Sequence, residues 1–174
     1  MQNIVTVFRD IRETDTPFHR DVNVVLRRIK DGASKDLVTK IRQSKDKDEI
    51  SKLKRQLPSI CFSGTFSRRN DASIKEHSGL ICLDFDDYDS RKELIADKKI
   101  LIQDRHVMAV FISPSGMGLK ALVQIPRDPD NHRLYFNALA EYFNNSHFDR
   151  TSKNISSVCY ESYDENIHIN YDSA

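Results

Sequence analysis

An apolar run, residues 79–83, passes into four aspartates within the next six residues, 84–89. On a β-strand, residues two apart point to the same face, at a separation of roughly 7 Å. Asp84 and Asp86 can therefore jointly hold two divalent ions, while Phe85 between them faces the core. This pattern predicts a two-metal site for Mg²⁺ or Mn²⁺, of the kind that phosphoryl transfer needs.

The Asp-x-Asp spacing alone is weak evidence, because it recurs at residues 46/48, 87/89 and 128/130. Residues 46 and 48 lie among lysines, and residues 128 and 130 flank a proline in a turn. Asp84 and Asp86 instead end a hydrophobic strand, where desolvating two carboxylates is costly without a counter-charge. A strand that runs into an acidic turn is the alternative interpretation.

A glycine-rich segment lies between two predicted strands, residues 107–112 and 119–125. It is not a P-loop, because the Gly-Lys-Ser/Thr ending is absent and a strand follows in place of a helix. Its backbone amides and hydroxyls could approach phosphate oxygens, with the lysine as a point charge. The candidate nucleotide-binding residues are Ser113, Ser115, Gly116, Gly118 and Lys120. The alternative is a tight β-hairpin whose glycines only supply positive φ.

The elements that must position these motifs differ between two regions of one predicted domain, 1–174. Residues 1–57 are mainly helical and basic, with helices at 22–29, from 37 and from 50, the last ended by Pro58. Residues 58–174 form a β-rich core. Strands are predicted at 4–8, 60–62, 80–85, 107–112, 119–125, 158–160 and 167–169, and further helices at 90–96 and 132–143. Such a mixture suggests an α/β or α+β fold.

The charge is balanced overall but not locally. The chain has 27 basic and 26 acidic residues, whereas residues 26–57 hold 11 Lys/Arg against 5 Asp/Glu. A basic segment of this kind can face phosphates, and a polar loop at 67–73 adds two arginines. The candidate DNA-binding residues are Lys54, Arg55, Arg68 and Arg69. A solvated charged face is the alternative.

Composition also indicates the compartment. Cys61, Cys82 and Cys159 lie in apolar stretches with no Cys-x-x-Cys pair, which favours buried thiols in a reduced environment. The amino terminus lacks the pattern of a signal peptide, and no run approaches the length of a membrane span. We therefore expect a cytoplasmic protein with no membrane partner.

Taken in order, these motifs resemble a known family. The segments are Leu-Pro-Ser-Ile-Cys-Phe-Ser-Gly-Thr-Phe at 57–66, the acidic strand at 78–86, Ser-Pro-Ser-Gly-Met-Gly-Leu-Lys at 113–120 and Phe-Asp-Arg-Thr at 148–151. The order is similar to that of the VirE amino-terminal family of primase-polymerases, a branch of the archaeo-eukaryotic primase superfamily. The resemblance spans nearly the whole chain.

The resemblance implies an α+β primase-polymerase fold, with a helical and β amino-terminal lobe packed on an RRM-like sheet. It implies template-directed joining of nucleotides in DNA replication, with Asp149 as the third metal-binding carboxylate beside Asp84 and Asp86. The implied partners are a single-stranded DNA template, nucleoside triphosphates and a helicase domain or protein, since the chain has no helicase-type P-loop.

Two departures from the superfamily pattern put activity in question. Many members carry a His where this chain has Lys120, and an Arg expected after the third carboxylate falls at about Ser157. Arg150 or Lys153 could substitute for it, or could simply belong to a solvated turn. Ser157 favours an alternative function, a catalytically weak module that binds single-stranded DNA or a nucleotide. A metal-dependent nuclease is less favoured, because the glycine hairpin suits a nucleoside triphosphate.

Overall fold

The computed structural model describes residues 2–173. Its strands are β1 (Ile4–Phe8), β2 (Phe18–Asp21), β3 (Ser59–Cys61), β4 (Gly64–Phe66), β5 (Ile74–His77), β6 (Leu80–Phe85), β7 (Val107–Ile112), β8 (Leu119–Gln124), β9 (Cys159–Tyr160) and β10 (His168–Ile169). Its helices are α1 (Val22–Asp31), α2 (Lys35–Gln43), α3 (Lys47–Lys54), α4 (Arg91–Leu101) and α5 (His132–Phe143), with a 3-10 turn at Asp71–Ser73. The prediction of an α+β protein is confirmed.

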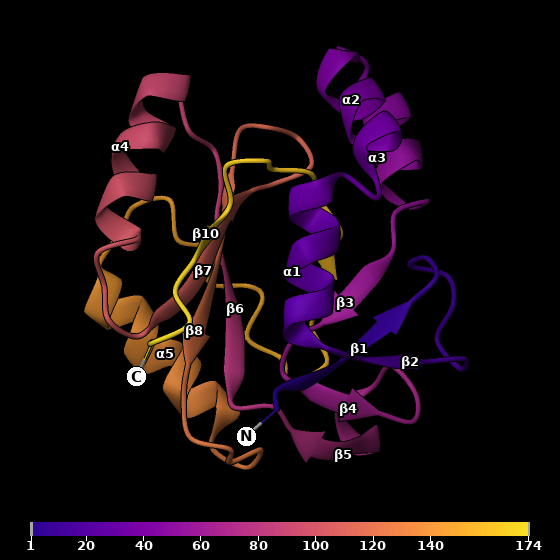
Figure 1. Ribbon diagram of the computed structural model, residues 1–174, viewed down its shortest axis with the longest axis vertical. Coiled ribbons are helices and arrows are strands. Elements are labelled where there is room, and N and C mark those ends of the chain that lie inside the picture. Colours follow the sequence, from indigo (N-terminus) through magenta and orange to yellow (C-terminus); the bar gives the residue numbers. More distant parts are fainter. Residues whose placement is uncertain (1, 174) are drawn as a thin grey trace.

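Two four-stranded antiparallel sheets form the centre of the molecule (Figure 1). The first has the strand order β2-β1-β3-β9, the second has the order β10-β7-β8-β6, and β4 and β5 form a separate pair. The first sheet joins β1 and β2, from the region predicted to be mainly helical, with β3 and β9 from the β-rich region. The last strands of the chain, β9 and β10, lie at one edge of each sheet.

Helices α4 and α5 cover one face of the second sheet (Figure 1). Leu83 and Phe85 of β6 pack there in one hydrophobic cluster with Leu94 of α4 and Phe136 of α5. All four side chains are at most 1% exposed. This core therefore buries the face of β6 that carries its odd-numbered residues, 81, 83 and 85.

The opposite face of the second sheet packs against α1 and the first sheet. Leu80 of β6 and Leu122 of β8 share a hydrophobic cluster with Leu26 of α1 and Ile60 of β3. Helix α1 therefore lies between the two sheets (Figure 1). The even-numbered side of β6 faces this junction.

The sequence of α1 explains both its ends and its buried face. The Asp21 side chain caps the first turn by accepting from the Asn23 N–H, and Gly32 ends the helix in the left-handed conformation with φ 83°. Val22, Val25, Leu26 and Ile29 recur at helical spacing and are buried.

The predicted helices and strands agree best with the structure where the apolar pattern in the sequence is strong. The bounds predicted for β1, β6, β7 and α5 match the structure. The third helix ends at Lys54 rather than at Pro58, and Leu57 is buried after the helix has ended. Strands β2, β4 and β5 were not predicted, because they are short and lack a continuous apolar pattern.

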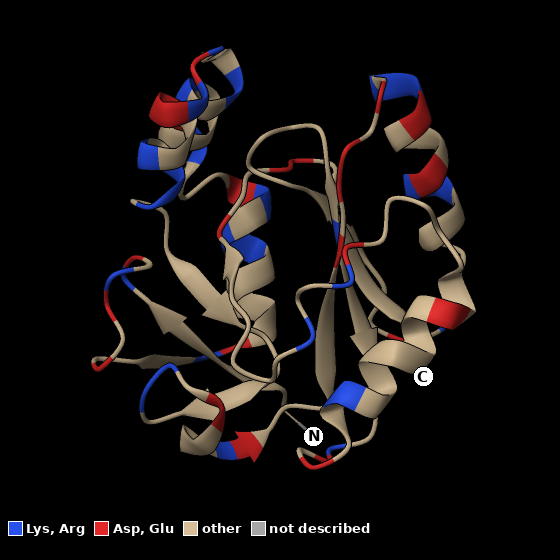
Figure 2. Ribbon diagram, turned by 180° about the vertical axis from the view of Figure 1, so that it is seen from behind, with Lys and Arg blue, Asp and Glu red and all other residues tan. Residues whose placement is uncertain are grey.

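Charge is spread unevenly over the helices. Figure 2 shows both signs interleaved on α2 and α3, whereas α5 is nearly uncharged. Among residues 2–173, we find no helix with both the length and the apolar character needed to cross a membrane.

Candidate metal and nucleotide site

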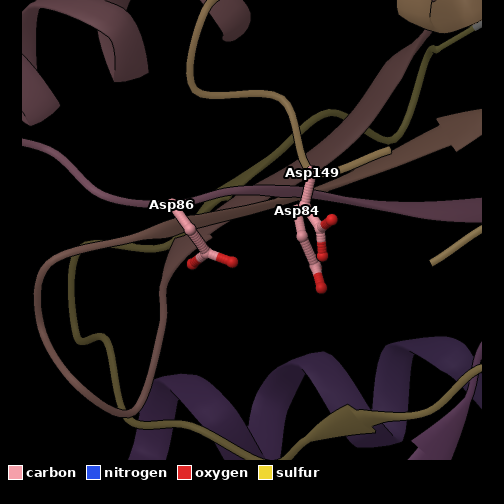
Figure 3. A group of neighbouring side chains, drawn as sticks. All are labelled: Asp84, Asp86 and Asp149. Atoms are coloured by element: carbon pink, nitrogen blue, oxygen red, sulfur yellow. The ribbon is translucent and has the colours of Figure 1, made fainter. Parts of the chain in front are cut away.

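Strand β6 directs Asp84 toward the junction between the sheets. Leu80 packs on that side, whereas Leu83 and Phe85 pack under α4 and α5. The period of two then places Asp84, and Asp86 just beyond the strand, on the same face as Leu80. Figure 3 shows both carboxylates on one side of the strand, as the sequence predicted.

Asp149 reaches the same face through a short antiparallel pairing at the end of β6. Its backbone N–H donates to the Asp84 carbonyl at 2.9 Å, and the preceding residue, Phe148, forms an isolated bridge with Phe85. The Phe148 ring packs edge-on against Phe85, with ring centroids 5.4 Å apart. Because successive residues of an extended segment point in opposite directions, burial of Phe148 turns Asp149 to the open side.

Asp84, Asp86 and Asp149 form an acidic cluster. Each offers a carboxylate oxygen, and these oxygens lie within 4.8 Å of one another. Burial raises the pKa of Asp86; Lys120 opposes this rise, while the charges of Asp84 and Asp149 add to it. Hard oxygen ligands and excess negative charge fit Mg²⁺ or Mn²⁺. The donor set is therefore suited to the predicted ions.

Lys120 lies beside this cluster on the neighbouring strand. The register of β6 and β8 sets it opposite Asp84, and its Nζ lies 2.6 Å from Asp84 Oδ1, with both side chains 13% exposed. Burial is the largest influence on the pKa of Lys120 and lowers it, but the surrounding acidic groups, Asp84 foremost, together outweigh burial and raise the pKa overall. In this structure Lys120 neutralises a carboxylate, and three aspartates against one lysine leave the cluster negative.

The glycine-rich segment forms a tight hairpin between β7 and β8. The Ser113 N–H donates to the Gly118 carbonyl at 2.9 Å, and Gly116 takes a φ of 83° that favours glycine. Gly118 is needed for another reason, since a Cβ there would collide with Asp86 Oδ1. The glycines therefore both form the turn and bring its backbone against the acidic cluster.

Two arginines that sequence analysis did not single out hold this hairpin. Arg42 of α2 donates to the carbonyls of Ser113 at 3.1 Å and Tyr163 at 2.8 Å. Arg91, at the start of α4, donates to the Gly116 carbonyl at 3.0 Å. Neither arginine belongs to a motif, and only the fold brings them to the hairpin.

Two hydroxyl residues after Asp149 were also missed. The Thr151 N–H and hydroxyl donate to the Asp149 carboxylate at 2.8 and 2.9 Å. The Ser152 hydroxyl lies 3.4 Å from oxygens of both Asp84 and Asp149. The Asp-x-Thr spacing, typical of an Asx turn, is the sequence signal that could have identified Thr151.

A cleft of ≈ 1030 Å³ opens beside the acidic cluster. Its lining residues are Lys54, Asp86, Asp87, Tyr88, Ser115, Met117, Ser146, His147, Phe148, Asp149 and Arg150. Burial, and then the nearby charge of Lys120, lowers the pKa of Lys54, whereas Asp86 opposes this change. The cleft thus brings together residues predicted for the metal, the nucleotide and DNA.

The other predicted DNA-binding residues lie apart from Lys54. Arg55 is exposed at the end of α3. Arg68 and Arg69 connect β4 and β5, and the Arg68 Nε lies 2.8 Å from Asp15 Oδ1. In Figure 1 α3 and the β4–β5 pair lie at opposite ends of the amino-terminal part of the molecule. The four residues therefore do not form a single surface.

Ser157, where the resemblance predicted an arginine, lies near the cluster. Ser157 and Asp84 both line a small pocket of ≈ 20 Å³. Of the two predicted substitutes, Arg150 lines the cleft and donates to Glu141 at 2.8 Å, and Lys153 is exposed.

Residues 52–168 match the family described as BT4734-like, N-terminal domain. The chain belongs to this family. The match begins within α3 and ends at the first residue of β10, so the BT4734-like domain includes the acidic cluster, the hairpin and the cleft.

This match corrects the resemblance to the VirE amino-terminal family, because the matching family is a different one. The motifs behind that resemblance are short, and the Asp-x-Asp spacing recurs at three other places in the chain, so they do not identify one family. No curated protein and no solved structure matches the chain.

Proposed function

We propose that this BT4734-like domain is a metal-dependent nucleotidyltransferase of the primase-polymerase type, which joins nucleotides on a single-stranded DNA template. The proposal includes the fold, with an amino-terminal helical and β lobe packed on the second sheet and the active site in the cleft. One observation carries it: three carboxylates from two segments converge beside a glycine hairpin, and both border the cleft.

In this proposal Asp84, Asp86 and Asp149 hold Mg²⁺ or Mn²⁺. The bound ions would supply Lewis-acid stabilisation of the charge that develops on the phosphoryl oxygens. The chain itself contributes mainly positioning and electrostatics. Thr151 and Ser152 orient the carboxylates through the contacts described above.

The residues around the hairpin would position the nucleotide. Ser113 and Ser115, whose hydroxyl oxygens lie 3.0 Å apart, offer polar groups near the cluster. Lys54 lines the cleft, and Lys120 lies beside Asp84 in the acidic cluster. Both would provide positive charge near the nucleotide, since a lysine acts on phosphate as a point charge. The volume of the cleft is sufficient for a nucleotide-sized ligand.

A second candidate is a module that binds nucleotide or single-stranded DNA without joining nucleotides. The contact between Lys120 and Asp84 favours it, because this pair already neutralises one metal-binding carboxylate. Ser157 favours it as well, since a serine there cannot provide the charge of an arginine.

Incorporation of labelled nucleotide on a primed single-stranded template, with Mg²⁺ or Mn²⁺, tests the proposal. We expect pyrophosphate release and template-dependent extension, both abolished by Asp84→Asn with Asp86→Asn. Asp46→Asn with Asp48→Asn is the matched control, because it removes two exposed charges at the same spacing outside the cleft. Nucleotide binding without pyrophosphate release would favour the second candidate, and cleavage of the strand would favour a nuclease.

A further inference from the structure

A second concave surface lies between α1 and the open edge of the first sheet. It is a groove of ≈ 310 Å³, and we call it the β2 groove. Its lining residues are Val7, Phe8, Arg9, Phe18, Arg20, Val25, Arg28, Pro58 and Glu161. None of the cleft-lining residues is among them, so it is a separate surface.

The floor of the β2 groove is set by strand register. Val7 of β1 pairs with Phe18 of the edge strand β2, and Val5 pairs with Arg20. Phe18 and Arg20 therefore point to the same face of the sheet, the one that α1 covers further in. Phe18 remains 47% exposed. An aromatic ring is thus presented at the edge of a sheet with only part of its surface packed.

The charge of the β2 groove is positive. Arg9, Arg20 and Arg28 line it, and Glu161 is the one carboxylate among the described lining residues. Glu161 is 1% exposed and already bonded to Arg28 at 2.7 Å. Arg9 lies 3.7 Å from a carboxylate oxygen of the neighbouring Asp10, but its side chain is 79% exposed. Two arginines therefore remain available to a ligand.

Arg20 also interacts with the aromatic ring. Its guanidinium carbon lies 5.6 Å from the centroid of Phe18, within the range of a cation–π contact. A flat ligand could stack on the exposed part of the ring, and the same guanidinium could contact an attached anion. In nucleic acid each flat base is joined through its sugar to a phosphate, so one nucleotide could make both contacts.

We propose that the β2 groove binds single-stranded nucleic acid, with a base on Phe18 and phosphates on Arg9 and Arg20. Sequence-tolerant proteins of this kind combine stacking aromatic side chains with a basic track. Duplex is disfavoured, because its bases are not free to stack on a protein ring. The proposal does not depend on catalysis; if the chain is a polymerase, this surface would hold the template at a distance from the cleft.

The test is fluorescence anisotropy of labelled 12-mers of dT and of U, with EDTA present, over a series of salt concentrations. Phe18→Ala and Phe18→Leu should each weaken binding roughly 10-fold, since leucine keeps apolar contact but cannot stack as an aromatic ring does. Arg9→Ala with Arg20→Ala should also reduce the log–log salt slope by about 1.4, or about 0.7 for each lost contact. The two oligonucleotides distinguish DNA from RNA as the preferred strand.

Lys92→Ala with Lys99→Ala is the matched control. It removes two exposed charges from α4, on the far side of the second sheet from β2 (Figure 1). An equal loss of affinity in this control, or unchanged affinity in both Phe18 variants with their folds intact, would overturn the proposal. An acidic peptide that binds the groove more tightly than either 12-mer would also overturn it. Because EDTA removes divalent ions, binding of the 12-mers in this assay does not depend on the proposed metal site, which separates this surface from the catalytic proposal.

Discussion

Two Lys–Asp pairs of similar burial lie at the second sheet, one within it and one beside it, but their surroundings differ. Lys98 Nζ lies 2.8 Å from Asp164 Oδ2, with side chains 11% and 4% exposed. Lys120 Nζ lies 2.6 Å from Asp84 Oδ1, with both side chains 13% exposed. Neither pair by itself indicates a function, because buried ion pairs also serve structure.

The Lys98–Asp164 pair is balanced in charge, and neither of its residues lines the cleft. Asp164 also accepts from the backbone N–H groups of Ile112 at 2.9 Å and Asn166 at 3.0 Å. Lys98 also donates to the Asn166 carbonyl at 2.9 Å. One positive and one negative charge are balanced, and several hydrogen bonds fix them, so this pair joins α4 to the carboxyl-terminal segment.

The Lys120–Asp84 pair adjoins further acidic residues that line the cleft. Two further carboxylates, Asp86 and Asp149, adjoin Asp84, and both line the large cleft. Its charge is therefore unbalanced, and it has access to ligands. The comparison teaches that uncompensated charge beside a cleft, rather than a buried charge as such, distinguishes a candidate site from a structural ion pair.

Lys98→Ala should have the largest effect on stability. It leaves the Asp164 carboxylate buried without its counter-charge, which typically costs about 3 to 5 kcal/mol. Urea unfolding measures the loss, with Lys99→Ala on the same helix as the exposed control. Added Mn²⁺ should not restore stability, because a single buried aspartate does not form a metal site.

Lys120→Ala should cost less, about 2 kcal/mol, because the charge-assisted bond is lost at a site that borders water. Unlike Lys98→Ala, this variant should recover stability when Mn²⁺ is added, and its affinity for Mn²⁺ should rise. A loss that Mn²⁺ leaves unchanged would make this pair equivalent to the structural one. Unfolding curves with and without the metal provide the measurement.

Replacing Asp86 or Asp164 by asparagine should change the free energy of unfolding in opposite directions. Asp86→Asn should stabilise the metal-free protein by about 0.5 to 1 kcal/mol, because it removes repulsion within the acidic cluster. Asp164→Asn should instead destabilise it, since Lys98 loses its partner. Unfolding in EDTA compares the two, and the same sign for both would remove the distinction between the pairs.

The sequence predicted the parts of this site that local periodicity determines. The alternation along residues 80–85 set Asp84 and Phe85 on opposite faces, and the apolar spacing in α1 with Gly32 after it set that helix and its end. The hairpin at residues 113–118 was predicted too. The structure confirms a turn there, but only Gly116 of its two glycines takes a positive φ, and contact with phosphate stays a prediction.

The remaining features depend on contacts between distant segments, which no local pattern records. Arg42 meets Ser113 only because the helical region packs beside the second sheet, and the partners Lys98 and Asp164 are 66 residues apart. Three of the four residues of strand β2 are exposed, and the strand is held by its register with β1. Such features follow from the assembled fold.

Titration calorimetry with Mn²⁺ tests the central claim most directly. We predict saturable binding by the unmodified chain, loss of binding in Asp84→Asn with Asp86→Asn, and retained binding in Asp46→Asn with Asp48→Asn. Circular dichroism should confirm that both variants are folded. Unchanged Mn²⁺ affinity in the folded Asp84→Asn, Asp86→Asn protein would contradict the metal site and the catalytic function proposed for it.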